Sequence, residues 1–307
     1  MYRSLLKLYY VLSAPIAIYF ILNSKSIHPT YRLSFFRKFS LGAKMFLNKF
    51  RIPTGTSYKS HLAMALKIME TPPEVEGAVV ECGSWRGGSS ANLSLICKLT
   101  NRKLIIFDSF EGLPQSDPSD RQGDYEPGAF AGSLEEVKKN IERCGAIERC
   151  EFVKGWFNET LPTLDTPVLL AFLDVDLELS LETCVRYIWP HLTEQGYIFI
   201  DEYVSLDYCA LFWSERYWEK YFNSPPPGLM GSGVGLPLGE YYVGPWPDND
   251  NRPLHHPNAG AYTRKDFSGH WIHFPDEDAG PYELQAAALD MEVLASGQNQ
   301  PSDLEKV

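Results

Sequence analysis

Two groups of acidic side chains follow apolar segments in the middle of the chain, and their chemistry is that of a divalent metal site. The first segment ends in Asp174-Val175-Asp176 and the second ends in Asp201-Glu202. In an open parallel sheet, ligands bind just beyond the carboxyl ends of the strands. Two adjacent strands would bring up to four carboxylates into one crevice. Crowded carboxylates repel one another and are costly to desolvate, so a divalent cation is the expected occupant; the alternative is solvated, capping acids.

The hydrophobic pattern predicts the elements that would position these acids. Leu169–Leu173 and Tyr197–Ile200 are apolar runs of strand length. The segment between them has the length of a crossover helix, and Pro190 would break it because proline cannot continue a helix. A turn at Gln195-Gly196 would then lead into the second strand. The unit predicted is strand, helix and parallel strand.

A glycine-rich turn follows another apolar strand upstream, at residues 77–81, and leads into a helix expected to begin near Ser89 or Ser90. Glycines let the backbone approach a ligand, and a helix N-terminus offers unpaired N–H groups. The spacing is neither that of the dinucleotide fingerprint nor that of a phosphate-binding P-loop. A tight connection without a ligand is the alternative. The candidate cofactor-binding residues here are Glu81, Gly83, Trp85, Gly87 and Ser89.

A second strand at Lys103–Phe107 ends in Asp108, about 20 residues after the turn. An acid at that place can accept hydrogen bonds from the two hydroxyls of a ribose. Without a phosphate-binding motif, S-adenosylmethionine fits this half-site better than NAD; the alternative is a solvated turn residue. The next strand, Cys150–Lys154, would end near the adenine ring. Further cofactor-binding candidates are Ser109, Gly155, Trp156 and Phe157.

The connections after these strands carry further candidates. The long polar loop Ser109–Pro127 has the length of a lid, and Tyr125 and Phe130 could close on a ligand or simply pack. A helix capped by Ser133 is expected to run to about Arg143.

An aromatic-rich helix is expected over Leu206–Phe222. Residues 223–258 lack periodicity and form either a substrate-facing wall, with Tyr241, Tyr242, Trp246 and His255-His256, or a surface insertion. Gly260–Lys265 and His270–Phe274 are expected to form a closing hairpin.

Composition divides the chain. With 44% hydrophobic and 22% charged residues it is a globular protein with a substantial core. Residues 1–69 contain eleven Lys/Arg and no acid, which leaves 17 of the 28 basic residues against all 39 acids in the rest. That acidic body argues against nucleic-acid binding. The six cysteines show no zinc spacing, which indicates reduced thiols.

The basic head includes an uncharged segment, Leu8–Ser24, flanked by Lys7 and Lys25. Its length is at the lower edge for a spanning helix, which needs about 17–25 apolar residues. Three interpretations stay open: a membrane anchor or interfacial helix on the cytoplasmic side, a cleaved targeting peptide, and a buried or partner-binding helix. The division expected is a basic apolar segment at 1–52, a catalytic domain at 53–280 with the insertion 223–258, and a tail at 281–307.

Four blocks in order carry a family resemblance: VVECGSWRGGSS, IIFDSFEGLP, VKGWFNETLP and FLDVDLELSLETCVRYIWPHLTEQGYIFIDEY. With them the chain resembles the macrocin O-methyltransferase family, metal- and S-adenosylmethionine-dependent enzymes that act on sugar hydroxyls of natural products. The resemblance implies a Rossmann-like class I methyltransferase fold, with a mostly parallel sheet, helices on both faces and a C-terminal antiparallel hairpin. It also implies oligomerisation.

Carried over residue by residue, the resemblance implies that Glu81, Gly83 and Gly87 shape the methionine pocket and that Asp108 holds the ribose. It further implies that Mg²⁺ is bound by Asp174, Asp201 and Glu202, and that Asp176 is the general base. The chain departs from the family at Glu202, where an aspartate is usual, and at Val175, where a glycine is common.

The function expected is therefore S-adenosylmethionine- and Mg²⁺-dependent O-methylation of a sugar or other small-molecule hydroxyl. A metal beside the hydroxyl would ease its deprotonation, and alignment of the reacting atoms would supply much of the rate. The alternatives are another enzyme class on the same fold and a membrane-tethered nucleoside-binding protein without methyl transfer.

Overall fold

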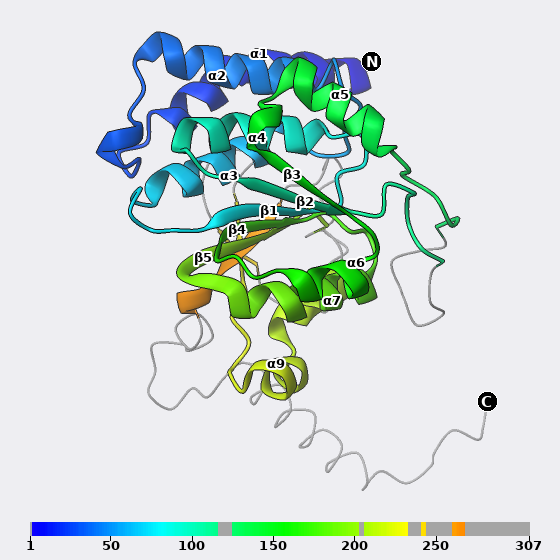
Figure 1. Ribbon diagram of the computed structural model, residues 1–307. Coiled ribbons are helices and arrows are strands. Elements are labelled where there is room, and N and C mark those ends of the chain that lie inside the picture. The colour runs from blue at the N-terminus through cyan, green and yellow to red at the C-terminus, as the bar shows by residue number, and fades with distance from the viewer. Residues whose placement is uncertain (1, 116–124, 203–205, 233–240, 244–259, 268–307) are drawn as a thin grey trace, which may run out of the picture.

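The computed structural model describes residues 2–115, 125–202, 206–232, 241–243 and 260–267 (Figure 1). Its centre is an eight-stranded sheet with the strand order β3-β2-β1-β4-β5-β8-β6-β7. The first five strands pair in parallel, and the last three pair antiparallel. The strands are β1 (Ala78–Cys82), β2 (Leu104–Asp108), β3 (Cys150–Lys154), β4 (Val168–Leu173), β5 (Leu192–Ile200), β6 (Leu229–Gly231), β7 (Tyr241–Val243) and β8 (Ala261–Arg264). The predicted Rossmann-like class, with an antiparallel C-terminal part, is confirmed.

Helices cover both faces of the sheet (Figure 1). Each face has its own hydrophobic cluster, as expected for a parallel sheet buried on both sides. One face carries α1 (Tyr2–Leu22), α2 (Phe35–Asn48), α3 (Tyr58–Glu70), α4 (Gly88–Thr100) and α5 (Leu134–Cys144). The other carries α6 (Phe157–Thr160), α7 (Glu178–Ile188), α8 (Leu206–Ala210) and α9 (Glu215–Phe222). Short 3₁₀ turns lie at Pro29–Tyr31, Ile147–Arg149, Leu161–Thr163, Trp189–His191, Leu211–Trp213 and Lys265–Phe267.

The register of the central strands explains why the acids meet. Leu173 at the end of β4 pairs with Ile200 at the end of β5, and it also pairs with Cys82 at the end of β1. The residues that follow, Asp174 and Asp201, therefore emerge side by side at one edge of the sheet. Both β1 and β4 are buried along their whole length, which fixes this register.

Serine side chains cap the starts of two helices. The Ser57 hydroxyl accepts a hydrogen bond from the N–H of Lys59 at the start of α3, and the Ser133 hydroxyl accepts one from Glu136 at the start of α5. Such caps satisfy N–H groups that have no partner within the helix. The predicted cap at Ser133 is confirmed.

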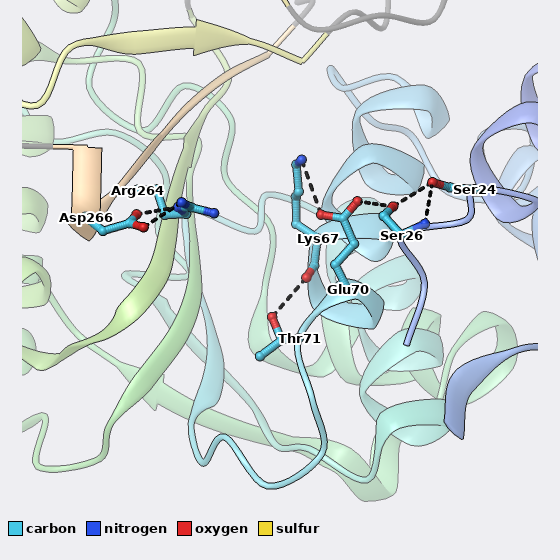
Figure 2. Close-up of polar contacts among 7 residues, drawn as sticks. All are labelled: Ser24, Ser26, Lys67, Glu70, Thr71, Arg264 and Asp266. Carbon is cyan, nitrogen blue, oxygen red and sulfur yellow. Dashed lines mark hydrogen bonds and ion pairs between the residues drawn. The ribbon is translucent and has the colours of Figure 1, made fainter. Parts of the chain in front are cut away.

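The N-terminal helices form an outer layer beyond α3 and α4 (Figure 1). Ile18 of α1 lies against Gly42 of α2, where an added Cβ would come within 2.3 Å of the isoleucine. The loop after α1 is fastened to the end of α3: the Ser26 hydroxyl donates to the Glu70 carboxylate, which also pairs with Lys67 at 3.3 Å (Figure 2). No helix among the described residues combines the length and hydrophobicity needed to cross a membrane.

The junction between α7 and β5 differs from the prediction. Pro190 lies in a 3₁₀ turn at the end of α7, as expected of a helix breaker. However, β5 begins at Leu192 rather than after a turn at Gln195-Gly196. The register jumps between Val168↔Leu192 and Leu170↔Tyr197, so the predicted turn is an irregularity inside the strand.

The C-terminal part also differs. Residues 229–231 and 241–243 form strands within the stretch expected to lack regular structure. The predicted strand at 260–265 is present as β8, but it pairs with β5 and β6. Its expected hairpin partner, residues 270–274, lies outside the described residues. The single helix expected over 206–222 is divided, because Ser214 caps a new helix, α9.

Candidate active site

A cleft of about 740 Å³ opens at the carboxyl ends of the parallel strands. Its wall is built by the turns after β1, β2, β3, β4 and β5 and by the start of α7. Most of the predicted site residues line it: Gly83, Trp85, Asp108, Ser109, Gly155, Trp156, Phe157, Asp174, Asp176, Asp201 and Glu202. The structure thus brings the predicted nucleoside half-site and the predicted metal site into one cavity.

The turn after β1 depends on glycine at two places. Gly83 has φ +84°, and a Cβ there would lie 1.9 Å from the carbonyl oxygen of Asp174. Gly87 has φ +81°, and a Cβ there would press on Val137 of α5 at 3.0 Å. Both glycines therefore adopt a left-handed backbone and allow close approach of another element. Gly83 lines the cleft, whereas Gly87 lies against α5 outside its wall.

Glu81 and Ser89 also lie outside the wall, in the core beneath it. Glu81 is fully buried on β1, and burial raises its pKa to about 7. The hydroxyls of Ser89 and Ser90 oppose that rise in pKa, and the charge of Asp108 adds to it.

Asp108 is held in a fixed orientation at the end of β2. Its Oδ2 accepts hydrogen bonds from the backbone N–H of Ser84 at 2.6 Å and from the Ser84 hydroxyl at 2.8 Å. Its Oδ1 accepts one from the N–H of Phe110 at 2.6 Å. Each carboxylate oxygen has two lone pairs, so the group retains acceptor capacity toward the cleft. Three of its four lone-pair sites are occupied, so Oδ1 can accept one further hydrogen bond, for example from a ribose hydroxyl.

The acids after β4 and β5 form a tight cluster. Among the described residues, Asp174, Asp176 and Glu202 can each place one carboxylate oxygen within 4.8 Å of the others. Burial raises the pKa of Asp174 well above its usual range, and the charges of Asp201 and Glu202 raise it further. Burial likewise raises the pKa of Glu202, together with the charges of Asp201 and Asp176. Three carboxylates so close together could hold a hard divalent cation.

Asp176 and Asp201 occupy different positions around this cluster. Asp176 has φ +57°, so its carboxylate reaches the cleft from a left-handed turn, and burial raises its pKa to about 6. Asp201 also lines the cleft and is almost fully buried, but it is not one of the three acids that meet the 4.8 Å spacing. The predicted ligand set and the observed cluster therefore share Asp174 and Glu202.

Three aromatic rings form one side of the cleft. Phe130 lies edge-on to Trp85 with ring centroids 5.9 Å apart, and edge-on to Tyr125 at 5.7 Å. The charges of Asp176 and Glu202 contribute to a raised pKa of Tyr125, after burial, so the tyrosine lies near the acids. The predicted ligand-facing aromatic residues Tyr125 and Phe130 are both in the wall.

Sequence reasoning missed several residues of the site. Ser84 holds Asp108, and its place directly after Gly83 in the turn was the available signal. Tyr208 of α8 is fully buried beside Glu202, whose charge contributes to the raised pKa of its hydroxyl. Nothing in the local pattern marks Tyr208, because α8 reaches the site only through tertiary packing. Gly55, before α3, also lines the cleft, whereas the predicted wall residues Trp246, His255 and His256 lie outside the described residues.

Two O-methyltransferases match a little less than half of the chain. A tetracenomycin-C rhamnosyl 4'-O-methyltransferase of Streptomyces olivaceus is 36% identical over 146 residues, which cover 44% of this chain and 56% of that protein. Demethyldecarbamoylnovobiocin O-methyltransferase of Streptomyces niveus is 31% identical over 147 residues, with the same coverage. The chain thus spans little more than half the length of these relatives.

Two solved methyltransferase structures and one family model also match the chain. The O-methyltransferase NovP aligns with 62% of this chain and 72% of its own, at 24% identity and a TM-score of 0.46. The calicheamicin methyltransferase CalS11 aligns with 67% of this chain and 77% of its own, at 21% identity and a TM-score of 0.46. The model of the macrocin-O-methyltransferase (TylF) family matches residues 54–225, which is more than half of the chain, and the chain therefore belongs to that family.

Proposed function

We propose that this protein is an S-adenosylmethionine- and Mg²⁺-dependent O-methyltransferase that acts on a hydroxyl of a sugar or another natural-product-like small molecule. The observation that carries the proposal is the cleft itself. It combines a fixed carboxylate, Asp108, at a nucleoside position with the acid cluster of Asp174, Asp176 and Glu202. A nucleoside-binding protein without transfer activity has no need of the second group.

The residues around Asp108 fit the cofactor. Asp108 would accept hydrogen bonds from the ribose, and Gly83 would let the methionine part approach the backbone closely. Ser109 and the segment Gly155–Phe157 would border the adenine, with Trp156 and Phe157 offering ring contacts. Glu81 and Ser89 would shape the floor from below. When bound, S-adenosylmethionine supplies an electrophilic methyl group on sulfur.

The acid cluster fits a hard divalent cation. Asp174, Asp201 and Glu202 would hold Mg²⁺, and the Glu202 Oε2 oxygen accepts no hydrogen bond from the described residues, which leaves it available as a ligand. The longer Glu202 side chain lies beside the Tyr208 hydroxyl, which can orient it. When bound, the cation supplies positive charge that makes a neighbouring hydroxyl more acidic.

Asp176 would act as the general base. It is one of the three clustered acids, and burial raises its pKa to about 6, so its carboxylate form can accept a proton at neutral pH. It would take the proton from the acceptor hydroxyl as the methyl is transferred, while the aromatic wall of Trp85, Tyr125 and Phe130 packs against the acceptor and excludes water. The rhamnosyl group in the name of one relative supports a sugar hydroxyl as the acceptor.

The catalytic unit proposed comprises residues 53–280, with 1–52 as an added N-terminal segment and 281–307 as a tail.

The first test is calorimetry with S-adenosylhomocysteine and with MgCl₂, followed by methyl transfer to a panel of rhamnosides and catechols. Binding of both with transfer to a hydroxyl is expected. Binding without transfer to any acceptor would favour a nucleoside-binding protein, and binding of neither would end the proposal.

A second test separates ligand from base. Asp174→Asn is expected to weaken Mg²⁺ binding and transfer together. Asp176→Asn is expected to lower kcat by about 10²–10⁴-fold while Mg²⁺ still binds. The exposed Asp165 provides the matched control, because Asp165→Asn makes the same chemical change away from the cleft. Loss of Mg²⁺ binding in Asp176→Asn would instead make Asp176 a ligand.

A further inference from the structure

The outer surface of α1 carries an apolar stripe that no described residue covers. Leu12, Ile16 and Phe20 follow one another at four-residue intervals, and their side chains are 64%, 58% and 63% exposed. The opposite side of the helix is buried, with Ile18 and Leu22 in the hydrophobic core. A helix that is apolar on all sides is normally buried on all sides. The outer half of α1 is therefore apolar but exposed, although an apolar helix surface is normally buried.

The neighbouring helix α2 has a stripe of the same kind. Phe36 is 83% exposed, and Phe39, Leu47 and Phe50 continue the stripe at intervals of one or two turns. The buried side of α2 contains Met45 and faces α1 and α3. Four large exposed apolar side chains along α2 and the turn that follows it exceed the isolated exposed hydrophobic residues of an ordinary surface.

The two stripes meet at a groove. A hollow of about 290 Å³ lies between α1 and α2, and its walls include Tyr19 from α1 and Phe35 and Phe39 from α2. Lys38 also lines it and donates a hydrogen bond to Asn23 at 2.9 Å. The face is thus continuous across both helices, and it lies on the side of the molecule away from α7 and α9 (Figure 1).

The charge around this face has one sign. Residues 1–52 contain nine Lys/Arg and no acid. Arg37 and Lys44 are exposed and stand two turns apart, on the flank of α2 beside its apolar stripe. Long basic side chains at the border of an apolar helix face can extend to phosphate groups while the face itself enters the acyl region.

We propose that the outer face of α1 and α2 docks this protein onto the surface of a membrane that contains anionic phospholipids. The helices lie in the plane of the interface and do not cross it. A second copy of the chain suits the face less well, because a symmetric contact would bring the two sets of cations together with no acid to pair them. The proposal is independent of the methyl-transfer chemistry, since the cleft is built by other elements.

The test is flotation of the full chain with vesicles of phosphatidylcholine alone and of phosphatidylcholine with phosphatidylserine. Binding to the anionic vesicles only is expected. Phe36→Ser combined with Phe39→Ser should weaken it by about tenfold or more, because two buried rings are lost. Arg37→Glu combined with Lys44→Glu should weaken it by at least about 25-fold, at roughly fivefold for each cation.

The matched control is Arg216→Glu combined with Lys220→Glu on α9, which makes the same charge change on the other face of the sheet. It should bind as the wild type does. Unchanged near-ultraviolet circular dichroism shows that each variant is folded. Absence of vesicle binding by the wild type would overturn the proposal, as would a dimer in light scattering that the Phe36→Ser and Phe39→Ser pair abolishes. Equal loss in the α9 control would also overturn it, because net charge alone would then explain binding.

Discussion

Asp176 joins two unusual properties in one residue. Its backbone is in the left-handed region, which aspartate tolerates better than most residues, and burial raises the pKa of its carboxyl to about 6. The motif Asp174-Val175-Asp176 identifies the acid, but it indicates neither the left-handed backbone nor the raised pKa. Both arise from the tight turn between β4 and α7, which turns the side chain into the cleft.

A pH profile of methyl transfer checks the role of Asp176. A base is active only when it is ionised, so kcat/KM should be constant at high pH and should fall about tenfold for each pH unit below the pKa of Asp176, which is about 6 without the cation and which bound Mg²⁺ lowers. Initial rates with saturating Mg²⁺ measure this, and the Asp176→Asn variant should lose the inflection. An identical inflection in that variant would assign the titration to another group.

Replacement of Gly83 should destabilise the fold strongly. A Cβ there would overlap the carbonyl oxygen of Asp174 at 1.9 Å, and its φ of +84° is strained for any other residue. Gly83→Ala should lower the free energy of unfolding by about 2 kcal/mol or more in urea titrations. Gly55→Ala is the control, because Gly55 has open space around its Cα and its variant should unfold as the wild type does. Equal stability of the two variants would mean that the turn relaxes freely.

At the scale of elements, the sequence predicts the regular part of the fold well. The strands β1–β4 and the capped helices α3 and α5 carry long apolar runs or side-chain caps, and each signal lies within the element itself. The strands β6 and β7 are three residues long, too short to show an alternating pattern. β6 pairs with β8, which is remote in sequence, and β7 pairs with β6. No local sequence pattern indicates the pairing of β6 with β8.

A buried polar network joins the helices on the cofactor side, and the sequence gives no sign of it. His61 of α3 lies 2.6 Å from the Thr56 hydroxyl through Nε2, and its Nδ1 accepts a hydrogen bond from Asn92 of α4 at 2.8 Å. Asn48 of α2 donates to Asn92 at 2.9 Å. Thr56 adjoins Gly55 of the cleft wall, so the network connects the N-terminal layer with the site.

The network makes stability depend on His61 staying neutral. Burial lowers the pKa of His61 to about 3, with a further contribution from the charge of Lys49. The unfolded chain takes up the proton near the ordinary pKa of 6.5, so this contribution is complete above that pH and is lost as pH falls toward 3. Between about pH 7.5 and 5 the loss should be about 2 kcal/mol.

Urea unfolding of a His61→Gln variant at the two pH values measures that loss. The variant should be less stable at neutral pH but should lack this part of the pH dependence. His191→Gln, which removes a histidine outside the core, should keep the wild-type dependence. If both variants changed the pH dependence equally, the titration would not belong to the network.

At the scale of the whole molecule, several acids lie close together at the carboxyl ends of the strands, and their negative charges destabilise the folded state. A carboxyl whose pKa is raised in the folded state stabilises the fold below its unfolded pKa, and this contribution is lost as pH rises through the folded pKa. For Asp176 the window runs from about 4 to about 6, and Asp174 and Glu202 extend it upward. A cation that binds the charged forms should reverse the effect.

Thermal unfolding with and without MgCl₂ tests this linkage. Without the cation, the Tm of the wild type should fall as pH rises from about 5.5 to 8 when it is measured relative to the double variant Asp174→Asn and Glu202→Gln, because that variant keeps the opposite contribution of His61. With the cation, the Tm should rise at both values and rise more at the higher pH, because fewer protons must be displaced there. KCl at equal ionic strength controls for screening. In the double variant Asp174→Asn and Glu202→Gln, the response to MgCl₂ should disappear; an undiminished response would place the cation elsewhere and remove the metal from the proposed chemistry.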